Sequence, residues 1–126
     1  MKIAAMVARL LLGLIFLVFG LNAFLHFIPM GPMPSGPAAQ FVGALAQSHY
    51  MPIVAVIQIV TSLLLLVNRY VPLALVLLGP VIVNIFFFHL LMEPSGLPLG
   101  ILVVVLWCVV AIYHRQAFSG IFVQRA

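Results

Sequence analysis

Amides and imidazoles interrupt the otherwise apolar runs of this sequence, and they are the residues whose chemistry could define a site. Asn22 and His26 stand four apart in the first run, Gln58 lies in the second, and Asn84 and His89 lie in the third. Polar groups at membrane depth are costly, so they usually face a bundle interior or a cavity, where they are candidates for function. We take these five residues as the hypothetical ligand-binding set.

The residue types limit the chemistry. Glu93 is the only acidic residue and lies at the edge of a run, so no carboxylate pair is available inside one for acid–base work or a proton relay. Amides and imidazoles can instead hydrogen-bond the oxygens of a neutral, flat molecule such as a quinone. Phe24, Phe27 and the stretch 86–88 would then supply apolar walls, or alternatively only face lipid.

Haem and metal are weaker hypotheses. A haem between His26 and His89 is conceivable in a helical bundle, but both histidines lie near the ends of their runs. No tight ligand spacing typical of a metal site is present, and we predict none. A further alternative for the polar set, favoured for Gln58, Thr61 and Ser62, is hydrogen bonding that only holds helices together.

The elements that must position these residues are membrane helices. The chain has 126 residues, of which 67% are hydrophobic and 5% charged, a composition that indicates one integral membrane domain over residues 1–126. Four apolar runs approach the roughly 30 Å of a hydrocarbon core at about 1.5 Å per residue. We therefore predict an all-α, antiparallel transmembrane bundle of four helices, with spans at 3–28, 51–67, 71–91 and 97–113.

The charges predict the orientation. The basic residues all fall on one side of the predicted spans: Lys2, Arg9, Arg69, Arg115 and Arg125. The positive-inside rule then places both termini on the cytoplasmic side, with residues 114–126 as a basic tail at that face of the membrane. Five scattered basic residues form no patch or stripe, so nucleic acid is not an expected partner.

A short helix is predicted between the first two spans. Gly36 can act as its N-cap and Pro37 as its first residue, and Phe41, Val42 and Leu45 then share one face. It would lie on the outer surface, as a lid over the bundle or as an interfacial anchor.

Two glycines of the first span predict a packing face. Gly13 and Gly20 are seven residues apart and so lie on one side of the helix. Small residues let a second backbone approach closely in a membrane. The approaching helix could belong to this chain, to a second copy or to a larger subunit.

The sequence also carries a family resemblance. The pattern Arg9-x3-Gly13-x2-Phe16-x3-Gly20-x-Asn22, the stretch PMGPMP, and NRYVPLALVLLGPVIVNIFFFHLLMEPSGL resemble the DoxX-like family of small bacterial membrane proteins over almost the whole chain. The resemblance implies a four-helix bundle, and it implies quinone-linked redox work because founding members are small subunits of a thiosulfate:quinone oxidoreductase. Relatives often carry glutamate at the position of Gln58, glycines near Thr61 and Ser62, and lysine or histidine at Ala23. An amide cannot titrate, so proton-coupled chemistry is not expected at the second span.

Together these observations favour an accessory role. We expect a small subunit or accessory of a quinone-linked oxidoreductase, or a binder of a small hydrophobic molecule in an outer-leaflet pocket, and not a complete enzyme on its own. The alternative is a non-catalytic structural or assembly partner of a larger membrane complex, or a homo-oligomer, docked through Gly13 and Gly20.

Overall fold

The computed structural model describes residues 1–27, 35–122 and 124, and the described residues are helical with no strand. The predicted all-α class is confirmed. The proline-rich stretch 29–34 and Arg125 lie outside the described residues. The elements in chain order are α1 (Lys2–Leu25), α2 (Pro37–Gln47), α3 (Tyr50–Leu66), α4 (Val71–Leu91), η1 (Pro94–Gly96), α5 (Leu97–Tyr113) and η2 (Arg115–Phe122).

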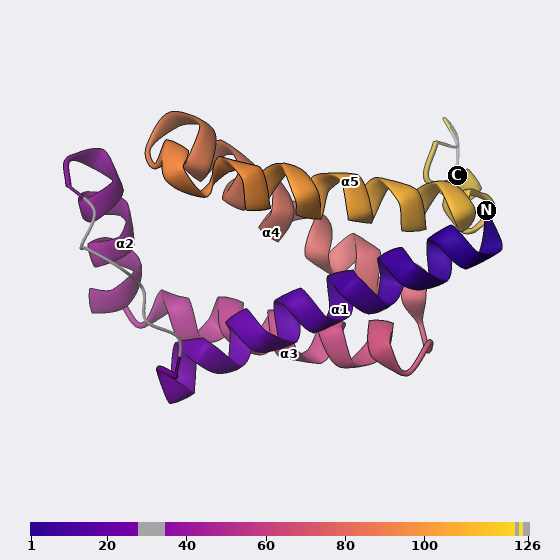
Figure 1. Ribbon diagram of the computed structural model, residues 1–126, viewed down its shortest axis with the longest axis horizontal. Coiled ribbons are helices and arrows are strands. Elements are labelled where there is room, and N and C mark those ends of the chain that lie inside the picture. The colour runs from indigo at the N-terminus through magenta and orange to yellow at the C-terminus, as the bar shows by residue number, and fades with distance from the viewer. Residues whose placement is uncertain (28–34, 123, 125–126) are drawn as a thin grey trace.

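The long helices α1, α3, α4 and α5 lie side by side along the length of the molecule (Figure 1). α1 packs against α3 and α5, and α4 packs against the same two, so α1 and α4 are diagonal. The two termini and the α3–α4 turn lie at one end, which we call the terminal end (Figure 1). The α4–α5 turn and α2 lie at the opposite end, which we call the α2 end.

Three helical segments of the described chain are long and apolar enough to cross a membrane. They are α1, α4, and η1 continued by α5, and α3 qualifies only together with α2, which is bent from it by 84°. The outward faces of these helices are apolar as well: Leu14, Leu73 and Val105 are each about half exposed. Such an exterior suits lipid better than water. The fold is thus consistent with a multi-pass membrane protein.

The core is a cluster of apolar side chains from all four long helices. Leu12, Leu65, Leu75 and Val110 are completely buried and represent α1, α3, α4 and α5 in turn. Aliphatic side chains of this size pack between helices without leaving a polar atom unpaired.

Gly13 and Gly20 bring α1 close to α3. A Cβ added at Gly20 would lie 2.9 Å from Cγ1 of Ile59 and 3.3 Å from the carbonyl oxygen of Ala55, and one at Gly13 would lie 2.9 Å from Cγ of Leu66. Distances below 3 Å leave no room for even one methyl group. The glycine face is therefore covered by α3 of the same chain.

Helix α1 ends three residues earlier than the predicted residue 28. His26 is its C-cap, in the left-handed conformation with φ 52°, and its N–H donates to the carbonyl of Asn22 at 2.9 Å. His26 thus leaves the helical spacing, and its side chain is exposed while that of Asn22 is buried. The two side chains do not share a helix face as the sequence predicts.

Helix α2 begins as predicted, and the other bounds agree closely. Gly36 is the N-cap of α2, with φ 64°, and Pro37 is its first residue. A positive φ suits glycine, and proline at the first helical position loses no intrahelical bond. The ranges of α4 and α5 equal the predicted ones, and α3 is displaced by one residue.

The glycine contact yields a test of the α1–α3 packing. Gly20→Ala should lower the stability of the helical fold in mild detergent by about 1–3 kcal/mol, because the new methyl group overlaps α3. Gly43→Ala is the matched control, since a Cβ there meets nothing within 4 Å, and it should leave stability equal or raise it by up to about 1 kcal/mol. Thermal unfolding followed by circular dichroism measures both. Equal melting of the two variants would contradict the close approach.

Candidate functional site

The polar residues of α1 and α3 differ in burial and in their hydrogen-bond partners. Asn22 is 6% exposed, and Gln58 is half-buried with its Cβ beside Gly20. Thr61 and Ser62 are completely buried, but their hydroxyls donate within α3, to the carbonyls of Ile57 and Ile59, each at 2.7 Å. These bonds thus stay inside one helix instead of joining two, because a hydroxyl can reach the carbonyl one turn back.

His89 lies in the last turn of α4 and faces the α4–α5 turn. Its Nδ1 lies 3.1 Å from the carbonyl oxygen of Glu93, and its ring covers Gly96 so closely that a Cβ there would overlap it. A Cβ at Gly100 of α5 would lie 3.7 Å from the same ring. The imidazole therefore packs the turn between α4 and α5.

This placement bears on the haem and metal hypotheses. His26 is exposed at the end of α1, whereas the ring of His89 is enclosed by the turn at the end of α4, and α1 and α4 are diagonal. The geometry offers no support for a haem between them. In the described ranges, no three His, Cys, Asp or Glu residues gather as metal ligands.

Asn84 lines a small hollow at the α2 end. Its side-chain Nδ2 donates to the carbonyl of Pro80 at 2.8 Å, which is the amide's one hydrogen bond to the described residues. The hollow has a volume of about 110 Å³ and is lined by Phe41, Asn84, Phe87, Phe88, Leu91 and Met92. The carbonyl oxygen of the amide and its second N–H remain available to a molecule in the hollow.

Helix α2 closes one side of this hollow. The ring of Phe41 meets the ring of Phe88 with centroids 5.4 Å apart, a normal separation for an aromatic pair. Phe24 and Phe27, which the sequence places among the walls, are instead exposed and do not line the hollow. The aromatic walls come from α2 and α4.

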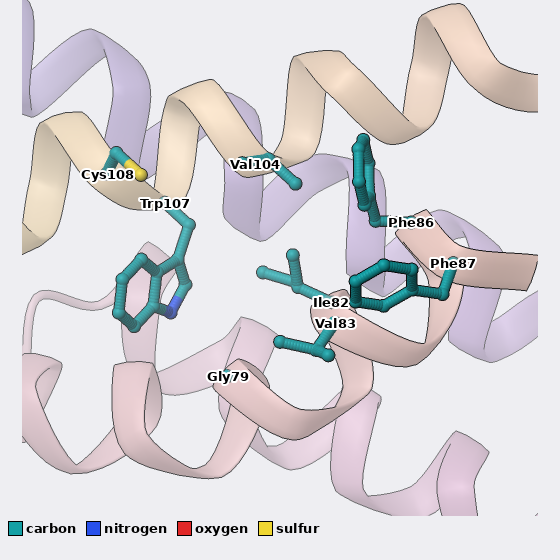
Figure 2. A pocket seen from close by; sticks show the side chains of 8 residues that line it. All are labelled: Gly79, Ile82, Val83, Phe86, Phe87, Val104, Trp107 and Cys108. Carbon is teal, nitrogen blue, oxygen red and sulfur yellow. The ribbon is translucent and has the colours of Figure 1, made fainter. Parts of the chain in front are cut away.

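A larger groove runs between α4 and α5. Its volume is about 270 Å³, and it is lined by Gly79, Ile82, Val83, Phe86, Phe87, Val104, Trp107 and Cys108 (Figure 2). Figure 2 shows the indole of Trp107 reaching from α5 toward α4, and Phe86 reaching from α4 toward α5. Phe87 lines both the groove and the Asn84 hollow, so the two spaces are adjacent.

Trp107 fixes the distance between the walls of the groove. Its Nε1 donates to the carbonyl of Leu75 at 3.0 Å, and the indole lies beside Gly79, where a Cβ would be 3.8 Å from Cζ2. Buried indole N–H groups usually find such a partner. This role is not predicted from the sequence, although a lone tryptophan in an apolar run is a reason to search for its acceptor.

Comparisons with protein-family models, with curated proteins and with solved structures returned no match. The resemblance to the DoxX-like family therefore stays a prediction.

The indole bond can be tested by a single substitution. Trp107→Phe keeps an aromatic ring but removes the N–H, so we expect a loss of about 0.5–1.5 kcal/mol in the stability of the folded protein in detergent. Tyr70→Phe removes a hydroxyl at a position that is 72% exposed and serves as the control. Thermal unfolding midpoints measure the difference, and a Trp107→Phe midpoint equal to that of the control would show that the bond contributes nothing.

Proposed function

We propose that this chain is a multi-pass protein of the bacterial inner membrane, with both termini in the cytoplasm, that binds a small hydrophobic molecule at the α2 end. The apolar outward faces of the long helices and the one-sided basic residues support the membrane placement. The single observation that carries the binding role is Asn84, an amide that lines a hollow walled by phenylalanines.

The position of Asn84 argues for a ligand. It lies about two turns from the last residue of α4, Leu91, so its amide is inside the apolar layer of the proposed bundle. An exposed amide at that depth is costly unless it has partners, and Pro80 satisfies only one of its N–H groups. A ligand carbonyl or hydroxyl would satisfy the rest.

The volumes restrict what can bind. An apolar cavity of about 150 Å³ holds one benzene molecule, so the hollow of about 110 Å³ takes the edge of a ring but not a whole substituted ring. The remainder of the molecule would pass over Phe87 into the groove of about 270 Å³. This arrangement favours a flat polar head that continues into apolar parts.

A quinone is the ligand class that we propose first. It carries carbonyl groups on a flat ring, it matches the amide and the phenylalanine walls, and it agrees with the DoxX-like resemblance. Gln58 and Asn84 cannot titrate, so the chain would hold the ligand without moving protons through them. This favours an accessory of a quinone-linked oxidoreductase. The alternative role is an assembly partner that docks through Gly13 and Gly20. We favour it less, because α3 covers both glycines.

The proposed orientation predicts which sites are reachable from outside. In a variant without Cys108, a cysteine at Ser35 or Ser95 should react with an impermeant thiol reagent added to intact cells, because both positions precede or follow helices at the outer face. A cysteine at Ser119 in η2 should react only after the cells are opened. The reverse pattern would overturn the orientation and the depth assigned to Asn84.

Ligand binding can be measured through Trp107, the only tryptophan in the chain. A short-tailed benzoquinone analogue should quench its emission in a saturable way in detergent. Asn84→Leu should weaken the apparent affinity about twofold to tenfold, the value of one lost hydrogen bond of about 0.5–1.5 kcal/mol. Gln116→Leu also replaces an amide by leucine, on exposed η2, and this variant should bind as the wild type does. Quenching that does not saturate, or equal affinity in both variants, would contradict the site.

A further inference from the structure

Two arginines meet the end of α3 at the terminal end of the molecule. Arg9 of α1 donates from Nη1 to the carbonyl of Leu65, and the same nitrogen lies 3.4 Å from the carbonyl oxygen of Leu66. The backbone N–H of Arg69 donates to the carbonyl of Leu64 at 3.0 Å. The side chain of Arg9 and the backbone of Arg69 therefore contact three consecutive carbonyls at the end of one helix.

These carbonyls do not neutralise two cations. The last carbonyls of a helix together carry only about half a negative charge. They occupy one nitrogen of the Arg9 guanidinium, and its remaining N–H groups stay available. The Arg69 side chain is exposed, on a turn whose residues Asn68 and Tyr70 have φ of 58° and 52°. One guanidinium, that of Arg9, thus lies at this helix end with donors to spare, and the exposed Arg69 side chain starts from the turn that follows the same helix.

The chain offers no carboxylate side chain to this pair. Its only acidic residue, Glu93, is at the α2 end, where its Oε1 accepts a hydrogen bond from Ser95 at 2.7 Å. The α4–α5 turn that holds it and the α3–α4 turn that holds Arg69 lie at opposite ends of the molecule (Figure 1). An anion that pairs with Arg9 and Arg69 must therefore come from outside the described chain.

The surroundings of the pair are apolar. Val67, two residues before Arg69, and Tyr70, directly after it, are 61% and 72% exposed, and Arg9 is half-buried. A free phosphate ion would satisfy the guanidinium groups but leave these side chains uncovered. A phospholipid supplies a phosphate together with acyl chains, so it complements both the charge and the apolar flank.

We propose that the headgroup of an anionic phospholipid binds at the end of α3, with its phosphate between Arg9 and Arg69. The planar guanidinium is the side chain best suited to the paired oxygens of a phosphate. In this site, Nη1 of Arg9 caps α3, and the other guanidinium nitrogens of Arg9 bind the phosphate of the lipid. This inference rests on the membrane placement proposed above, but it does not depend on a ligand at Asn84.

Native mass spectrometry of the full-length protein in detergent gives the test. Phosphatidylglycerol and phosphatidylcholine of the same chain length are titrated separately, and bound lipid is measured against lipid concentration. We expect tighter binding of phosphatidylglycerol, and we expect Arg69→Gln to weaken it about fivefold, the usual value of one arginine near an anionic lipid. Arg9→Lys keeps the charge but loses the planar fork, so it should bind more weakly than the wild type while remaining folded.

Arg115→Gln is the matched control at the same end of the molecule. Its Nη1 donates to the carbonyl of Ile112 at 3.1 Å, so it caps α5 as Arg9 caps α3, but it is not at the end of α3. If Arg115→Gln loses as much lipid affinity as Arg69→Gln, the basic residues attract the lipid diffusely. The proposed phosphate site between Arg9 and Arg69 would then be wrong. Inorganic phosphate that displaces the lipid at equal concentration would overturn the assignment to a lipid.

The two proposals fail in distinguishable ways. A protein that does not insert into phosphatidylcholine vesicles would refute the membrane placement itself. A protein that inserts but shows no preference for phosphatidylglycerol would refute only the headgroup site. Arg69 is exposed and outside the core, so its variant tests the site without disturbing the fold.

Discussion

The structure depends on one constraint: a polar group surrounded by apolar atoms must have a hydrogen-bond partner. Among the described residues, no buried side-chain nitrogen or oxygen lacks one. Most partners are backbone carbonyls. Trp107 reaches a carbonyl of α4, Arg9 reaches the last carbonyls of α3, and Thr61 bonds one turn back within its own helix. These bonds decide which polar residues are free to meet a ligand, and Asn84 keeps its amide oxygen and one N–H because its hydrogen bond to Pro80 uses a single N–H.

Much of the helical framework could be predicted, because the apolar runs are long and the turns are marked by residues with specific backbone preferences. Gly36 and Pro37 define the start of α2, and the ranges of α4 and α5 are reproduced. The candidate site could not be predicted as one set. Spacing places a residue along a helix, but the neighbour that it faces depends on how the helices pack. His89 is directed to its own turn by Gly96, and His26 leaves the helix through a left-handed cap that the apolar pattern does not encode.

The α1–α3 and α4–α5 interfaces are packed by different kinds of residue. This difference explains why the groove lies between α4 and α5. α1 approaches α3 through Gly13 and Gly20, so that interface is filled by backbone and by the side chains of Ile59 and Leu66. α4 meets α5 through Trp107, whose large ring beside Gly79 leaves the groove open on either side. A glycine opposite aliphatic side chains closes the α1–α3 interface, whereas Gly79 opposite an indole forms one wall of a groove. The groove is therefore a consequence of residue size, and it faces the apolar exterior where Val83 and Phe87 are about half exposed.

Helix α2 also contributes to the hollow that Asn84 lines. It is joined to α3 through His49, which has φ 61°, and it meets α4 through the rings of Phe41 and Phe88. An aromatic pair contributes about 0.5–1.5 kcal/mol beyond the area that it buries, and a hydrogen bond to Asn84 would contribute a similar amount. The hollow takes only the edge of a ring, so the hydrogen bond to Asn84 is a small part of the free energy of binding. Binding would then be governed by the apolar area that the ligand buries over Phe87, and its selectivity by the amide.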